Sequence, residues 1–188
     1  MDVFLEYLMK KKQTGMDVLK QLGLILAGIV ASYIVMVIFS MLGSFFASYT
    51  LLAVAGVFYG TWVLLRNYKL EYEYIFTNGD LDIDVIKAQK TRKRLTSLQC
   101  KKIEVMASDK NMTHKRSFEN ESISKKYNAV FDPNLGGIYH VLFTYDGEKR
   151  LLTFQPPAKL LEAMKKFNPR CVFVDEEDLV EESVEDNE

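Results

Sequence analysis

The sequence predicts a hairpin of two membrane-spanning helices followed by an α+β domain, an antiparallel β-barrel capped by a C-terminal helix. Three observations lead to this fold class. Residues 21–65 carry no charge, the apolar period changes to two directly after Arg66, and one amphipathic helix follows the last predicted strands. A chain of 188 residues has room for one such domain and an appendage.

The uncharged block of 45 residues is too long for a single crossing. One helix of that length would measure about 68 Å at ~1.5 Å per residue, roughly twice the thickness of the hydrocarbon layer. Gly43-Ser44 is the natural break, and it leaves residues 22–42 and 47–65 as two segments near the ~20 residues that a span requires. The connection is short, so the two helices are predicted to be antiparallel neighbours.

The charges that flank the block predict its orientation. The break itself carries no charge, whereas cations precede the first span and follow the second: Lys10, Lys11, Lys12, Lys20, Arg66 and Lys69. Under the positive-inside rule both termini then lie in the cytoplasm, as expected for a multi-pass protein of the cell (plasma) membrane.

Small residues recur at four-residue spacing in both predicted spans. They are Gly23, Ala27 and Ala31 in the first and Gly56 and Gly60 in the second. Such spacing lets two helix backbones approach closely. We interpret these residues as the packing seam within the hairpin, with a homo-oligomer through the membrane helices as the alternative.

Residues 66–174 are predicted to form the cytoplasmic domain. Alternating apolar residues on both sides of Asn78-Gly79 indicate a hairpin, and Asp146-Gly147 marks a second one. Pro156-Pro157 then opens a helix whose apolar stripe consists of Leu160, Leu161, Met164 and Phe167.

The two ends of the chain are predicted to lie outside this domain. Residues 1–20 form a cytoplasmic segment, for which a helix lying on the inner leaflet is one interpretation because apolar residues recur there at helical spacing. Residues 175–188 hold nine acids and no base, which is typical of a solvated, disordered tail. Without this tail the chain carries a formal charge of +8.

The soluble part resembles a known family. "YEYIFTNGDLDI" followed by "RKRLTSLQCKKIEV" is similar to the opening of bacterial pleckstrin-homology-like (PH-like) domains, and "LLTFQPPAKLLEAMKKFNPR" to their last strand and capping helix. The resemblance covers roughly Gly23 to Val174. It implies a PH-like barrel behind a transmembrane hairpin, and it supplies no catalytic residues. The polar stretch 108–126 is longer than in the shorter family members, so the strand register there is not predicted.

The residue types that carry chemistry are sparse. His114 and His140 have no Cys, His or carboxylate at metal-ligand spacing, and no nucleophile motif is present. Cys100 and Cys171 make no disulfide framework, and Cys100 is expected in the core. The sequence therefore predicts no catalytic residue, no metal, no cofactor and no enzymatic activity.

A basic run is the strongest functional signal. Five cations fall within eight residues in a predicted connection between strands, and two more flank the membrane: Lys87, Lys90, Arg92, Lys93, Arg94, Arg66 and Lys69. A solvated connection, a contact with anionic membrane lipid, and a protein or nucleic-acid contact are the three interpretations. Nucleic acid is the least favoured, since the spans hold the domain at a bilayer.

The sequence thus predicts a non-enzymatic membrane protein that presents a PH-like binding or scaffold domain to the cytoplasm, with membrane lipids and a protein as partners. A module that senses anionic lipid through residues 87–94 is the first alternative. An accessory subunit of a membrane complex is the second.

Overall fold

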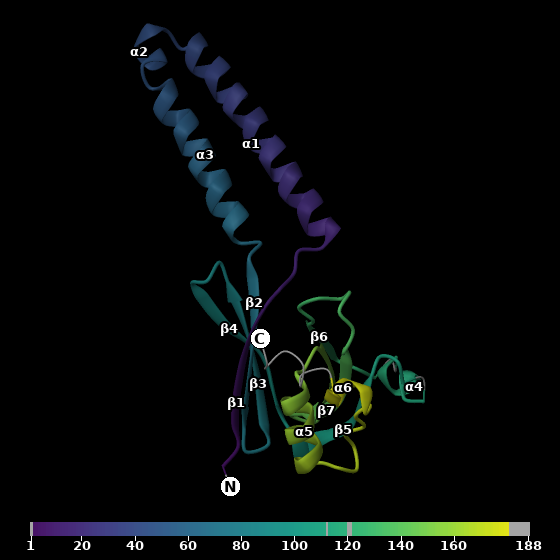
Figure 1. Ribbon diagram of the computed structural model, residues 1–188. Helices are drawn as coiled ribbons and strands as arrows, with labels where there is room; N and C mark the ends of the chain where they lie inside the picture. Colours follow the sequence, from purple (N-terminus) through teal and green to yellow (C-terminus); the bar gives the residue numbers. More distant parts are fainter. Residues whose placement is uncertain (1, 112, 120–121, 181–188) are drawn as a thin grey trace. The chain divides into compact units, whose positions relative to one another are not determined.

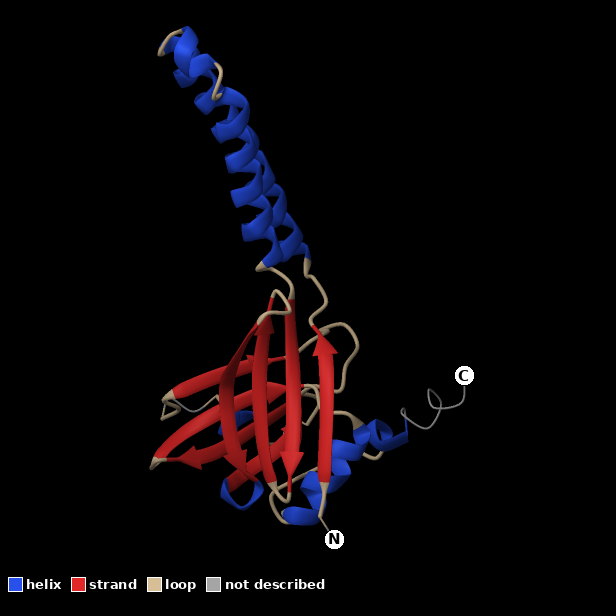
Figure 2. Ribbon diagram, turned by 90° about the vertical axis from the view of Figure 1, so that its left-hand side faces the viewer, coloured by secondary structure: helices blue, strands red, loops and turns tan. Residues whose placement is uncertain are grey.

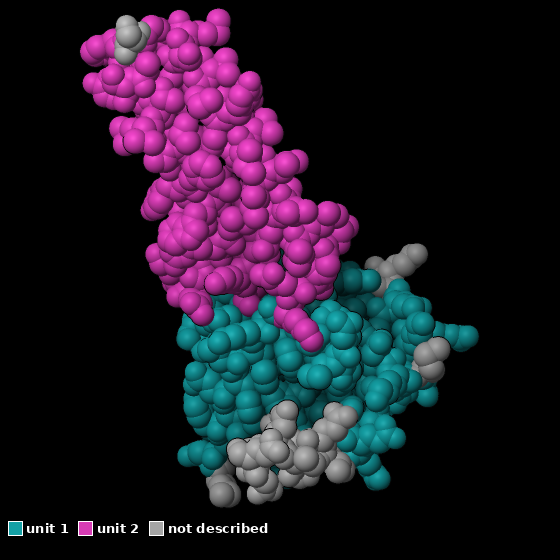
Figure 3. All heavy atoms as spheres, turned by 45° about the horizontal axis from the view of Figure 1, so that its top comes forward, with its two compact units in different colours: residues 1–11, 71–86, 92–188 teal, residues 12–70, 87–91 magenta. Residues whose placement is uncertain are grey.

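The computed structural model describes residues 2–111, 113–119 and 122–180. Contacts divide the chain into two compact units, each assembled from separate stretches of sequence (Figure 3). One unit holds residues 12–70 and 87–91. The other holds residues 1–11, 71–86 and 92–188.

The first unit contains the apolar helices α1 (Gly15–Met41), α2 (Ser44–Ala47) and α3 (Thr50–Arg66). The Asp17 carboxylate fixes the start of α1, because it accepts hydrogen bonds from the backbone N–H (3.2 Å) and the hydroxyl (2.9 Å) of Thr14. Among the described helices, α1 alone is both long and apolar enough to cross a membrane by length and composition; α3 is a shorter apolar helix of 17 residues.

Helices α1 and α3 lie side by side (Figure 1), and they are in close contact at Gly28. A Cβ at Gly28 would lie 2.6 Å from the Thr61 hydroxyl, so only glycine fits there. Ser32, one turn further on, is also buried. The hydroxyls of Ser32 and Thr61 donate to backbone carbonyls of their own helices, so neither lacks a hydrogen bond in the apolar seam.

The three glycines of the predicted packing seam do not lie at the contact between α1 and α3, and the homo-oligomer alternative stays a prediction. A Cβ at Gly23, Gly56 or Gly60 would meet nothing within 4 Å. Ala27 is exposed and Ala31 half-buried. Four-residue spacing identifies a stripe along a helix, but it does not say which stripe faces the neighbour, and both helices are apolar all round.

We predict that Gly28→Leu disrupts the pairing of α1 with α3, whereas Gly60→Leu does not. The larger side chain at residue 28 has to push Thr61 away, and such overpacking typically costs ~1–3 kcal/mol. Thermal unfolding of both variants in detergent checks this. Equal loss of stability in the two variants would contradict a seam at Gly28.

The second unit is built on two four-stranded sheets, whose strands cross in Figure 2. The first has the order β1 (Phe4–Lys10), β2 (Leu70–Thr77), β3 (Asp80–Lys87), β4 (Thr91–Gln99). The second has the order β5 (Ile103–Ser108), β7 (Tyr139–Tyr145), β8 (Glu148–Phe154), β6 (Lys125–Ala129). The shorter elements are η1 (Cys100–Lys102), α4 (Lys115–Phe118), α5 (Ala158–Phe167) and α6 (Glu177–Val180).

This arrangement corrects the predicted antiparallel barrel in two respects. The described strands group into two sheets instead of one closed sheet. In addition, β6 pairs with β8 in parallel, with Lys125 opposite Arg150. The parallel pair arises because the long polar stretch after β5 carries the chain to the far edge of the second sheet before β7 begins.

The N-terminal segment is a strand and not an interfacial helix. Strand β1 pairs antiparallel with β2 over its whole length, from Phe4 opposite Thr77 to Lys10 opposite Glu71. Its alternate residues Leu5, Tyr7 and Met9 pack against the core. Seven residues fit a helical and a strand period equally well, and pairing with β2 decides between them. The domain therefore begins before the membrane helices, and the boundary predicted at residue 66 is wrong.

The core of this unit combines both sheets with α5. Leu160, Leu161 and Met164 are buried, which confirms the predicted apolar stripe. The Phe167 ring meets Phe76 edge-on, with 5.6 Å between the ring centroids. Cys100 is also fully buried, as predicted, and burial raises the pKa of its thiol to about 12.

Both predicted hairpin turns are confirmed. Asn78 and Gly79 have φ angles of 50° and 97°, and Asp146 and Gly147 have 50° and 77°. Positive φ at both central residues is the requirement of a type I′ turn.

The predicted acidic tail begins too early. Residues 175–180 belong to the folded unit, because α6 lies within them and Leu179 packs against the core. The rest of the predicted tail, residues 181–188, lies outside the described residues.

Candidate functional site

The structure divides the predicted basic cluster between the two units. Arg66, Lys69, Lys87 and Lys90 belong to the unit that holds the apolar helices. A type I′ turn at Ala88-Gln89 joins β3 to β4, and its Ala88 N–H donates to the carbonyl of Lys69 at 2.9 Å. This bond ties the turn to the segment that follows α3. The Arg66 guanidinium lies over the Trp62 ring, 4.9 Å from its centroid.

Arg92, Lys93 and Arg94 lie on β4, since the strand begins at Thr91. The predicted connection 87–94 is therefore a short turn followed by a strand. Lys93 is exposed, but the two arginines are engaged in ion pairs within the sheet. The side chains of both arginines are still about half-exposed, and a contact of this run with lipid stays a hypothesis.

The arginines compensate buried acids on β2 and β3 of the same sheet. Arg92 contacts the carboxylate of Glu73 at 2.6 Å. Arg94 contacts Asp82 at 2.6 Å and also Asp84. The side chains of Glu73 and Asp84 are only 4% and 5% exposed, and a buried carboxylate requires such a partner. Burial raises the pKa of Glu73 while Arg92 lowers it, and the neighbouring Glu6 and Asp84 raise it further.

We predict that Arg94→Ala destabilises the domain, whereas Lys93→Ala on the same strand leaves it unchanged. Loss of Arg94 leaves Asp84 buried without its cation. Because Arg94 is itself half-exposed, we expect a cost of about 1–3 kcal/mol, below that of a fully buried pair. Denaturant unfolding in detergent, followed by circular dichroism, measures the difference. A loss below about 0.5 kcal/mol for Arg94→Ala would contradict the structural role.

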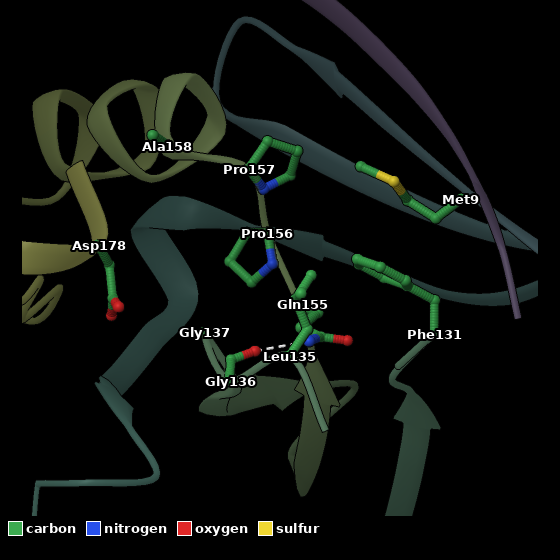
Figure 4. A pocket seen from close by; sticks show the side chains of 10 residues that line it. All are labelled: Met9, Phe131, Leu135, Gly136, Gly137, Gln155, Pro156, Pro157, Ala158 and Asp178. Carbon is green, nitrogen blue, oxygen red and sulfur yellow. Dashed lines mark hydrogen bonds between the residues drawn. The ribbon is translucent and has the colours of Figure 1, made fainter. Parts of the chain in front are cut away.

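A pocket of about 450 Å³ forms a second candidate, and all of its lining residues belong to the second unit. Figure 4 shows the side chains that surround it. They come from β1, the loop after β6, the start of α5, and α6: Met9, Phe131, Leu135, Gly136, Gly137, Gln155, Pro156, Pro157, Ala158 and Asp178. The volume is in the range of small-ligand and side-chain pockets.

One wall of the pocket is fixed by the buried amide of Gln155. Its Nε2 donates to the carbonyls of Asp132 (2.8 Å) and Gly136 (2.5 Å), and its Oε1 accepts from the Asp132 N–H (3.0 Å). Gly136 and Gly137 both have positive φ, and a Cβ at either would meet nothing within 4 Å. The wall is thus held in place and opens into free space.

Asp178 places a carboxylate at this pocket. Its Oδ2 accepts a hydrogen bond of 2.6 Å from the buried Tyr139 hydroxyl, which also accepts from the Asp175 N–H. Burial, and then the Asp178 carboxylate, raise the pKa of Tyr139, so its hydroxyl stays protonated as the donor. The described residues that line the pocket include no Lys, Arg or His.

No single motif in the sequence predicts this pocket. The helix start predicted at Pro156-Pro157 is correct, but nothing in that motif places it beside the turn at 132–137. Met9 and Asp178 fell in segments predicted to lie outside the domain. The Asp-Pro turn with its paired glycines, together with the Pro-Pro helix start, is the signal that could have been used.

The histidines have structural surroundings. The His114 ring stacks on Phe173, with 4.6 Å between centroids. The His140 ring lies between Thr153 (2.9 Å) and Asp109 (3.1 Å). Over the described ranges, no group of three or more His, Cys, Asp or Glu side chains is placed to hold a metal ion.

Comparison with known proteins gives one match. Neither curated proteins nor solved structures match the chain. The model of a protein family described as "Bacterial PH-like domain (DUF6106)" matches residues 1–174. The match includes β1 and the apolar helices as well as the sheets and α5, so it extends further towards the N-terminus than the resemblance first suggested. On this evidence the chain belongs to the bacterial PH-like domain family.

Proposed function

We propose that this protein is a non-enzymatic integral membrane protein that presents its PH-like domain to the cytoplasm as a binding or scaffold module. The observation that carries the proposal is the pairing of β1 with β2. These strands precede and follow the apolar helices, yet they are neighbours in one sheet.

This pairing favours two membrane crossings over one. If α1 alone crossed the bilayer, β1 and β2 would lie on opposite sides and could not share a ladder. An even number of crossings is needed, and α3 is the remaining apolar helix between the two strands. Its 17 residues are at the lower limit for a span. The flanking lysines then place both ends in the cytoplasm.

The links between helices and strands are short. Four residues separate β1 from α1, and three separate α3 from β2. At ~3.3–3.6 Å per residue they reach at most about 14 Å and 11 Å. Two such links tether the domain to the apolar helices, which suits a scaffold for membrane-bound partners.

We predict that Ser48→Cys is labelled from outside intact cells and that Lys110→Cys is labelled only after permeabilisation. Ser48 precedes α3 and Lys110 follows β5, and both are exposed. A membrane-impermeant maleimide on a Cys171→Ser background makes the measurement, and the buried Cys100 serves as an internal blank. Labelling of Lys110→Cys in intact cells would refute the cytoplasmic domain.

A contact with anionic lipid is the second candidate function. The hydrogen bond between Ala88 and Lys69 favours it, since it keeps Lys87 and Lys90 in the same unit as the membrane helices and Arg66. Cations close to an anionic surface contribute ~1 kcal/mol each. The roles of accessory subunit and homo-oligomer remain predictions without a specific observation in their favour.

For this second function we predict that the double variant Lys87→Ala/Lys90→Ala retains roughly tenfold less phosphatidylglycerol than the parent protein. The full chain is offered mixed phosphatidylglycerol and phosphatidylcholine in detergent, and retained lipid is measured by native mass spectrometry. Lys101→Ala/Lys102→Ala, which removes two exposed lysines of η1, is the matched control. Equal retention by both double variants would exclude the lipid contact.

A further inference from the structure

We propose that Glu6 of β1 and Glu73 of β2 share one proton, and that this proton keeps β1 docked on the first sheet. Its loss loosens β1, which contributes Met9 to the wall of the pocket (Figure 4). The inference concerns a pair of acids that the proposed function does not use. It makes one wall of the candidate site sensitive to pH, and it does not depend on where the domain lies in the cell.

The register of the first sheet brings the two carboxyl groups together. Leu8 lies opposite Glu73 in the ladder. Glu6 lies opposite Ile75, so Glu6 is a diagonal neighbour of Glu73. Tyr7 packs against the core, and side chains alternate along a strand, so Glu6 and Leu8 lie on the opposite face of the sheet. Diagonal pairs on one face are within reach of long side chains, so two glutamates there can form a hydrogen bond.

The Glu73 carboxyl is buried with one oxygen unsatisfied. Its side chain is 4% exposed, and its Oε1 accepts a hydrogen bond of 2.6 Å from Arg92. No donor among the described residues reaches its buried Oε2. The Glu6 side chain is in hydrogen-bonding contact with Glu73, but two ionised carboxylates have no proton to donate. A single proton on either acid supplies the missing donor.

The charges around Glu73 favour a bound proton. They stand on its own strand and on the other three strands of the sheet: Glu6, Lys10, Glu71, Asp82, Asp84, Arg92 and Arg94. Acids outnumber bases in this set, and both arginines already form ion pairs with acids. Lys10 is exposed and lies opposite Glu71. The site takes a proton and not a metal ion, since the described part of the chain contains no group of three or more His, Cys, Asp or Glu side chains placed for a metal.

The direction of the pH effect follows from the burial of Glu73. Burial raises the pKa of this carboxyl, Arg92 lowers it, and Glu6 and Asp84 raise it further, so the pKa lies above the ordinary value of a glutamate. When β1 leaves the sheet, water reaches Glu73 and the contact with Glu6 is lost. The docked strand therefore binds the proton more tightly than the undocked strand. Docking is strongest below the ordinary glutamate pKa, and it weakens as the pH rises through the raised pKa, by up to about tenfold per pH unit for one proton.

The test measures hydrogen exchange of the full chain in detergent by mass spectrometry. Exchange rates at each pH are divided by the intrinsic rates of the unfolded chain, which gives the protection of each segment. Strand β8 serves as the internal reference for β1, because both belong to the same unit. We expect the protection of residues 4–10 relative to β8 to fall at least about fivefold between about pH 5 and about pH 8.

Variants at residue 6 identify the proton. In Glu6→Gln the side-chain amide is a permanent donor to Glu73, so β1 should keep the low-pH protection of the parent protein at every pH. In Glu6→Ala the donor is absent, so β1 should be less protected than in the parent at about pH 5. Glu162→Gln removes an exposed acid of α5 and is the matched control, which should keep the pH dependence of the parent.

Two results would overturn the proposal. One is a parent protein whose β1 protection relative to β8 does not change with pH. The other is a Glu6→Gln variant that loses protection with rising pH as the parent does. The cysteine labelling measures topology by a separate readout, so failure of the shared proton leaves the topology intact, and the reverse also holds.

Discussion

The pairing of β1 with β2 is the constraint on which the rest of the structure depends. The two strands share a ladder from Phe4–Thr77 to Lys10–Glu71, although 59 residues lie between them. Everything in that interval has to leave the sheet at the end of β1 and return beside it, where Glu71 pairs with Lys10. The helical unit satisfies this condition because α1 and α3 lie side by side, close enough at Gly28 to exclude a Cβ.

The same pairing explains which parts of the fold could be predicted. Local signals were sufficient for the hairpins, where Asn78-Gly79 and Asp146-Gly147 require positive φ, and for α5, where Leu160, Leu161 and Met164 recur at helical spacing. The strand β1 could not be predicted in this way. Its seven residues are separated from their partner strand by the apolar block. The only local signal was the spacing of their apolar residues, which fits a helix and a strand equally well.

The candidate sites show the same limit. The basic run is visible in the sequence, but the partners of Arg92 and Arg94 are acids on β2 and β3, and only the sheet brings them together. In the sequence, Asp82 and Asp84 alternate with apolar residues after Asn78-Gly79, and the arginines form a separate cluster. The structure joins them into one network that neutralises buried charge. The pocket depends on β1, on the loop after β6 and on α6, and two of these three segments had been placed outside the domain.

The helical insertion also determines the entropic cost of bringing β1 and β2 together. Closing a flexible loop of 59 residues instead of a two-residue turn would cost about 3 kcal/mol in chain entropy. That is a large share of the ~5–15 kcal/mol by which a domain is stable. Once α1 and α3 pack as antiparallel neighbours, the ends of the insertion are close together and most of this cost is removed. The stability of β1 is therefore linked to the packing at Gly28 and Thr61. Because Met9 of β1 lines the pocket, the integrity of the pocket is linked to that packing as well.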